Sequence, residues 1–202
     1  MRSAVHYFAA LGTALLFAAG AVAQESMRVR GTIERVEAGV LHVKARDGSD
    51  LTVQLTDDAV TVALVKASLA DIKAGTFVGV TGLPQPDGTQ KAVEVHIFPE
   101  SMRGTGEGHR PWDLRPQSTM TNASVDQVVT GVDGHTLRVK YKEGEKTIVV
   151  GADTPVVTYL PGTRDELKPG TKIFIPAASR QPDGTLRAQR ISFGRNGLTP
   201  PM

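Results

Sequence analysis

The chain contains no cysteine, which excludes a disulfide framework, a cysteine nucleophile and attachment of a lipid to an N-terminal cysteine. Aromatic residues make up only 5% of the 202 residues, and Trp112 is the only tryptophan. Single-strand nucleic-acid binding usually needs stacked aromatics on a basic groove. Lysine and arginine are nearly balanced by acids, at a formal net charge of +2. The composition therefore indicates neither nucleic acid nor an anionic membrane surface as a partner.

Only one apolar run is long, and it lies at the N-terminus. Arg2 precedes an apolar stretch from Phe8 to Ala19, and Ala21-Val-Ala23 supplies the small residues of a cleavage site before Gln24. The stretch is shorter than the roughly 20 apolar residues that a membrane span needs. We expect residues 1–23 to be a signal peptide, and the mature protein to be periplasmic or secreted without a transmembrane segment.

Two stretches of the chain, about 96 residues apart, carry the same motifs. Ser68 to Thr76 and Thr163 to Thr171 share one pattern, and the sequence Gln-Pro-Asp-Gly-Thr follows each of them. Recurrence at a fixed spacing indicates two copies of one structural unit. The expected division of the chain is a signal peptide (1–23), module 1 (24–98), a linker (99–121), module 2 (122–195) and a C-terminal tail (196–202).

Both stretches have the alternation of apolar and polar residues that is typical of half-buried strands. Leu51, Val53 and Leu55, for example, alternate with polar residues. Asp-Gly and Glu-Gly pairs supply turns between such runs. Five short strands with regular turns in each copy favour a small barrel or sandwich.

One short helical segment is predicted between the third and fourth strands of each copy. Ser68 and Asp71 have the spacing of a capping box, and Gly75 fits the left-handed position after a helix. Thr163, Glu166 and Gly170 repeat this pattern in the second copy. This order is that of an OB-type barrel. We therefore expect an all-β protein of two tandem five-stranded OB-like barrels, each with one short helix.

The caps and turns also carry a family resemblance. Leu167-Lys-Pro-Gly-Thr171, Asp183-Gly-Thr185 and Ala188 to Phe193, with their counterparts in the first copy, resemble domain-of-unknown-function family 5666, an uncharacterised family of exported bacterial β modules. The resemblance implies an exported OB-like architecture. It implies no activity, because the residues that carry it are caps, turns and core positions.

Residues 99–121 break the strand pattern with three glycines and three prolines, as expected of a linker. Within it, the segment Gly108-His-Arg-Pro-Trp-Asp113 can be interpreted in two ways. Either Trp112 anchors an envelope protein or small ligand, with His109, Arg110 and Asp113 as polar contacts, or Trp112 fixes the linker to a barrel and Arg110 and Asp113 form a surface pair. The linker resembles that of small exported proteobacterial proteins labelled as metal-transporter components.

A metal site would have to be built from few ligands. Met102, His109 and Met120 supply the thioethers and imidazole that suit copper(I), whereas zinc would use histidine. His42 and His96 alternate with apolar residues, so we expect them to point outward from strands.

No catalytic motif is present. The sequence lacks G-x-S-x-G and H-E-x-x-H, and the adjacent carboxylates at 57–58 and 165–166 fit a turn and a helix start. We expect no catalytic residues and no cofactor. The sequence favours a non-catalytic exported binding or scaffolding protein of the cell envelope, and the alternative is a periplasmic metal-handling protein that takes copper or zinc.

Overall fold

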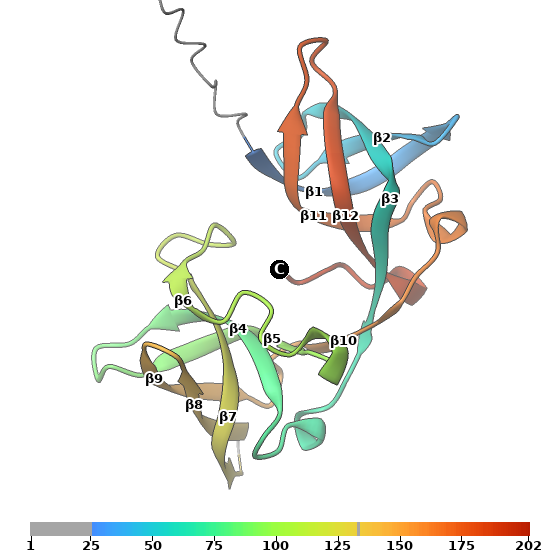
Figure 1. Cartoon of the computed structure of the whole chain (residues 1–202). Helices are drawn as coiled ribbons and strands as arrows, with labels where there is room; N and C mark the ends of the chain where they lie inside the picture. Colours follow the sequence, from blue (N-terminus) through green and yellow to red (C-terminus); the bar gives the residue numbers. More distant parts are fainter. Residues whose placement is uncertain (1–25, 133) are drawn as a thin grey trace, which may run out of the picture.

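The structure is a computed structural model that describes residues 26–132 and 134–202. The expected signal peptide, and the first two residues of the expected module 1, lie outside these ranges. The described part is an all-β protein with a single network of twelve paired strands (Figure 1). No helix in this part is long and apolar enough to cross a membrane.

Ten of these strands close into two five-stranded cycles. The first consists of β1 (Ser26–Glu37), β2 (Val40–Ala45), β3 (Asp50–Lys66), β12 (Leu186–Gly194) and β11 (Lys172–Arg180), in that order around the barrel. The second consists of β7 (Thr119–Gly131), β8 (Gly134–Tyr141), β9 (Gly144–Gly151), β5 (Gln90–Ile97) and β4 (Phe77–Pro84). Both cycles have the same order, and in each one pair of strands is parallel: β3 with β12, and β5 with β9.

Each barrel therefore combines strands from both halves of the chain. Three consecutive strands of one half meet two consecutive strands of the other, so the expected pair of tandem barrels, at 24–98 and 122–195, is not the arrangement that the strand pairings show. Figure 1 shows the consequence: β11 and β12 stand in the upper barrel beside β1 to β3, whereas β4 and β5 stand in the lower barrel beside β7 to β9.

The length of β3 explains why the halves exchange strands. From residue 59 to 66 the sequence Ala-Val-Thr-Val-Ala-Leu-Val-Lys has no glycine, proline or asparagine, so nothing in it favours a turn. The chain continues as a strand out of the first barrel, where Val62 to Lys66 pair antiparallel with β10 (Val156–Pro161). The two crossing segments thus form a ribbon that joins the barrels.

Each short helical segment is followed by a residue that packs into the barrel containing the next strand. They are single 3₁₀ turns, η1 (Leu69–Asp71) and η3 (Arg164–Glu166), and both capping boxes are confirmed. The backbone N–H of Ser68 donates to the Asp71 carboxylate at 2.8 Å. After η1, Ile72 is buried in the core of the second barrel, and after η3, Leu167 is buried in the core of the first.

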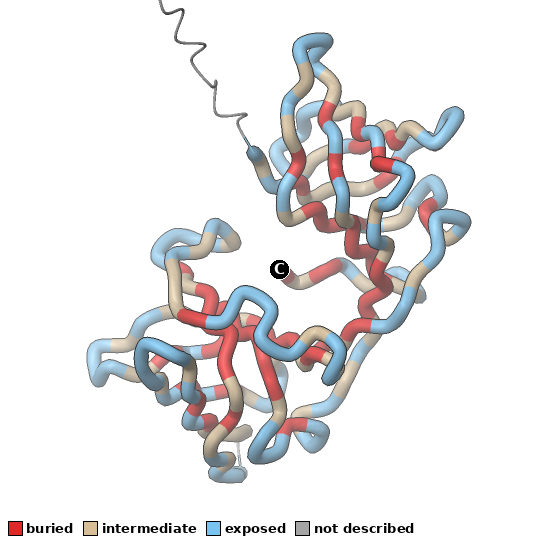
Figure 2. The backbone as a smooth tube through the Cα atoms, in the orientation of Figure 1, coloured by how far each residue is buried: buried red, intermediate tan, exposed pale blue. Residues whose placement is uncertain are grey.

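A third apolar cluster lies between the barrels. It includes Leu64 of β3, Phe98, Tyr159 of β10 and Phe174 of β11, with Trp112 packed against it. Buried residues consequently continue from the first barrel along β3 into the ribbon, as Figure 2 shows.

The expected linker is partly ordered into regular structure. It contains the 3₁₀ turn η2 (Glu100–Met102) and the strand β6 (Gly108–Pro111), which pairs with β7. β7 itself begins at Thr119, before the expected start of module 2 at residue 122. The turn η4 (Arg195–Gly197) crosses the expected boundary between module 2 and the tail, and Met202 in the tail is buried.

Candidate functional site

A pocket of about 190 Å³ lies at the seam between the two barrels. Both barrels, the β10 segment and residues of the former linker contribute to its walls. Its apolar walls are formed by Phe98, Met102, Trp112, Met120, Tyr159, Phe174, Pro176 and Met202. Its polar residues are His96, Thr105, Arg110, Asn122, Arg190 and Ser192. No single half of the chain could form this pocket alone.

Trp112 fastens the linker to the first barrel. Its ring meets Phe174 of β11 edge-on at a centroid distance of 6.4 Å, and the guanidinium carbon of Arg28 lies 4.1 Å from its centroid. Its backbone is held by Ser118, whose carbonyl accepts from the Trp112 N–H at 2.8 Å. The indole N–H is buried and has no hydrogen-bond partner among the described residues.

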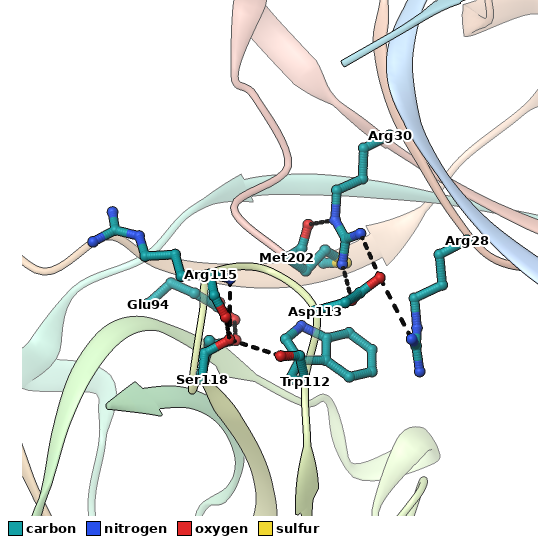
Figure 3. A network of polar contacts seen from close by, with 9 residues as sticks. Arg28, Arg30, Glu94, Trp112, Asp113, Arg115, Ser118 and Met202 are labelled. Carbon is teal, nitrogen blue, oxygen red and sulfur yellow. Dashed lines mark hydrogen bonds and ion pairs between the residues drawn. The ribbon is translucent and has the colours of Figure 1, made fainter. Parts of the chain in front are cut away.

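Asp113 pairs with the first barrel and not with Arg110. Arg30 donates to both of its carboxylate oxygens at 3.1 and 2.8 Å, and Arg28 lies 3.5 Å away (Figure 3). The hydrogen bonds from Arg30, with the charges of both arginines, hold the pKa of Asp113 below its usual range. The expected surface pair of Arg110 and Asp113 is therefore wrong: β1 brings two arginines to this carboxylate instead.

Two other arginines at the pocket have no carboxylate partner among the described residues. Arg110 donates from Nη1 to the carbonyl of Gly106 at 2.7 Å, and Nη2 of Arg190 lies 3.7 Å from the sulfur of Met102. Burial, together with the charge of Arg28, lowers the pKa of the Arg110 guanidinium. Both groups are half-buried cations that lack a neutralising anion.

A buried polar chain stands behind the pocket. The Thr81 hydroxyl donates to the Glu94 carboxylate, whose other oxygen lies 2.5 Å from Nε2 of His96. Nδ1 of His96 lies 3.3 Å from the Tyr159 hydroxyl. Burial raises the pKa of the Tyr159 hydroxyl, and the nearby charge of Glu94 adds to this.

The expectation that His96 points into solvent is wrong, because only 2% of the residue is exposed. Sequence alternation placed it on the face of β5 opposite the barrel core. The side chain of Tyr159, on β10, packs against His96 there: the two rings meet edge-on at a centroid distance of 5.7 Å. His42 lies on β2, where no such ribbon crosses, and its side chain remains 29% exposed.

The predicted metal trio is not brought together. Met102 and Met120 line the seam pocket, whereas His109 does not. On β6 successive side chains point to opposite faces: Arg110 faces the pocket, and the His109 ring lies beside Tyr141 with Nδ1 2.8 Å from the Thr121 hydroxyl. Within the described ranges no group of three or more histidine, cysteine, aspartate or glutamate residues could hold a metal ion.

The sequence-based candidates Arg110 and Trp112 both line the pocket, but its far wall was missed. Arg190 and Ser192 lie on β12. They are the counterparts, in the second stretch, of Glu94 and His96 in the first, because the number of residues between them equals the number between the two Asp-Gly turns. The missed signal was that these strand positions differ in charge between the two stretches, whereas the caps, turns and core positions match.

Comparison with known proteins finds a family match for one part of the chain. Residues 30–96 match the model of a family described as a domain of unknown function (DUF5666). The matched stretch runs from β1 to β5, so it contributes strands to both barrels. The expected resemblance of the first stretch to this family is thereby confirmed. No curated protein and no solved structure matches the chain.

Proposed function

We propose that this protein is a non-catalytic binding protein of the cell envelope, built from two OB-like modules that exchange their last two strands. The pocket at the seam carries the proposal, because both barrels and the linker that contains Trp112 converge on it. The exported location rests on the N-terminal sequence. The match to the family of unknown function is compatible with this role and supplies no activity.

The size of the pocket limits its occupant. A dry cavity of about 150 Å³ is enough to hold benzene, and drug-sized ligands usually need about 300 Å³ or more. At about 190 Å³ the seam pocket accepts one ring-sized group. The ligand is therefore a small molecule with one apolar ring or branched chain.

The polar chain supports binding and not catalysis. A serine nucleophile needs a histidine nitrogen that is free to take its proton. In His96, Nε2 lies 2.5 Å from a Glu94 carboxylate oxygen and Nδ1 lies 3.3 Å from the Tyr159 hydroxyl, and within the described residues neither nitrogen is hydrogen-bonded to Ser192. Ser192 consequently serves as a wall of the pocket rather than as a nucleophile.

The fluorescence of Trp112 provides the test, since no other tryptophan contributes. Ring-sized ligands should shift or quench the emission of the mature protein in a saturable manner. Ser192→Phe should fill the pocket and remove this response. Arg138→Gln should leave the response unchanged, because Arg138 is an exposed residue of β8 that does not line the pocket. Saturable binding that Ser192→Phe does not affect would place the site elsewhere.

A second candidate function is the handling of a soft metal ion. Three thioethers, those of Met102, Met120 and Met202, line the same pocket, and thioethers suit copper(I). The guanidinium of Arg190, 3.7 Å from the Met102 sulfur, opposes a cation there. Elemental analysis of the purified protein and titration with copper(I) and zinc decide the matter: no bound or titratable metal would eliminate this candidate.

A further inference from the structure

We propose that the ligand of the seam pocket is a small organic carboxylate, whose acid group binds the guanidiniums of Arg110 and Arg190 and whose apolar body packs on Trp112 and Tyr159. This inference rests on the proposed binding function and names the chemical class of its ligand.

Positive charge at the seam exceeds negative charge. Arg28 and Arg30 share the carboxylate of Asp113, and Nε of Arg30 also donates to the main-chain oxygen of Met202 at 2.7 Å. The other nearby carboxylate, Glu94, is buried: one of its oxygens accepts from Thr81 and the other lies 2.5 Å from Nε2 of His96. Arg110 and Arg190 therefore face the pocket without a carboxylate of their own in the described part of the chain. A ligand that carries one negative charge would supply what these two cations lack.

The two guanidiniums also have donors to offer. A guanidinium has five N–H donors, and the structure gives Arg110 one hydrogen bond, to the carbonyl of Gly106. The contact of Arg190 is to a thioether sulfur, which is a weak acceptor. A carboxylate accepts such donors in a paired, charge-assisted geometry, which is the strongest hydrogen bond available to arginine.

A further donor lies at the apolar wall. The indole N–H of Trp112 is buried without a partner, and its nitrogen lies on the side of the ring that faces Met202, another wall residue of the pocket (Figure 3). A buried donor without an acceptor is costly. An oxygen of the ligand would satisfy it, so donors at this end favour an acceptor-rich group.

The remaining wall fits the apolar part of such a ligand. Phe98 and Tyr159 stack at a centroid distance of 5.2 Å, and Phe174 meets Trp112 edge-on at 6.4 Å. Aromatic rings pack favourably against such walls. A ligand amine would place a cation beside Arg110 and Arg190, so the pocket should reject it.

Three probes of nearly equal size separate these possibilities: benzoate, benzyl alcohol and benzylamine. Binding to the mature protein is followed by calorimetry and by Trp112 emission. We expect benzoate to bind at least about tenfold more tightly than benzyl alcohol, because charge-assisted hydrogen bonds are about twice as strong as neutral ones. Benzylamine should not bind.

Variants of the two arginines test whether their guanidiniums bind the carboxylate of the ligand. Arg190→Gln and Arg110→Gln should each weaken benzoate about tenfold or more and leave benzyl alcohol unchanged. Arg190→Lys should retain part of the benzoate affinity, because the charge remains while the paired geometry is lost. Arg187→Gln is the matched control, since Arg187 lies on the same strand, is exposed, and does not line the pocket.

Two failures can be told apart. Equal affinity for benzoate and benzyl alcohol, or benzoate binding that neither Gln variant weakens, would overturn the carboxylate inference and leave the seam pocket as a binding site. Absence of binding by all three probes, with the melting curve of the wild type intact, would overturn the proposed pocket function as well.

Discussion

Leu64 and Tyr159 face one another as Cα partners in the antiparallel ribbon between the barrels. Their separation along the sequence equals that between the cap residues Ser68 and Thr163. Corresponding positions of the two motif-bearing stretches thus meet in this ribbon, as they do at a two-fold axis between identical surfaces. The ribbon is the place where each stretch leaves one barrel and enters the other.

This exchange predicts which engineered cysteines can bond. Thr32 of β1 is the Cα partner of Lys172 of β11. Antiparallel partners lie about 4.5–5.5 Å apart, within the range for a disulfide. Because the natural chain has no cysteine, Thr32→Cys with Lys172→Cys should give one clean disulfide, read by mass spectrometry of the intact, unreduced protein.

The matching control is Thr32→Cys with Phe77→Cys. Phe77 begins β4 at the place that Lys172 holds in β11, so a tandem arrangement would bond this pair instead. Formation of this second disulfide, and not of the first, would show that the barrels are not exchanged.

The buried pair of Glu94 and His96 should matter for stability. Their side chains are 1% and 3% exposed, and removal of one member of such a pair usually costs about 3–5 kcal/mol because the other is left buried and unpaired. We expect Glu94→Ala to lower the free energy of unfolding by an amount in this range, measured by urea denaturation. Glu100→Ala, which breaks an exposed pair with Arg103, should change it by less than about 1 kcal/mol.

The lowered pKa of Glu166 predicts how the stability of the protein changes in acid. Hydrogen bonds from Arg195 and from the backbone of Thr163 lower its pKa from 4.5 to about 2. A carboxyl group whose pKa is lower in the folded state stabilises the fold above pH 4.5, and this contribution is lost as the pH falls from 4.5 toward 2. The lowered pKa of Asp113 acts in the same direction.

The measurement compares melting temperatures of wild type and Glu166→Gln across this pH range. Glutamine keeps the capping geometry and has no carboxylate to titrate. The difference between the two proteins should be largest near neutral pH and shrink below pH 4.5. A constant difference at all pH values would contradict the assigned role of the Glu166–Arg195 pair.

Trp112 should serve both binding and attachment of the linker. Replacing a fully buried tryptophan by alanine costs about 3–5 kcal/mol, and Trp112 is half-buried, so we expect Trp112→Ala to cost about 1–2 kcal/mol. The same change should abolish calorimetric binding of pocket ligands. Trp112→Phe keeps an aromatic wall and should retain most of both properties. An alanine variant that binds like the wild type would leave Trp112 a structural role only.

The local structure could largely be predicted from the sequence. Ser68 with Asp71, and Thr163 with Glu166, form capping boxes because the required side chains lie three positions apart in the chain. The alternating strands and the all-β class follow in the same way from short-range periodicity. The signal peptide and the exported location stay predictions from the N-terminal sequence.

The path of β3 could also have been inferred. The unbroken run from residue 59 to 66 contains no turn former, and it predicts a strand too long for one small barrel. What it does not reveal is the strand's destination, because the apolar positions of β4 and β5 match those of β11 and β12. Either pair could satisfy the same barrel, so local pattern cannot select between them.

Only the tertiary structure decided the exchange of strands and, with it, the site. His96 points outward from its barrel by alternation alone, yet Tyr159 of the ribbon packs against it. Arg190 reaches Met102 only because β12 has crossed into the first barrel. The sequence determined elements whose contacts are a few residues long. The pocket depends on contacts between residues far apart in the chain, which are fixed by where two long strands cross.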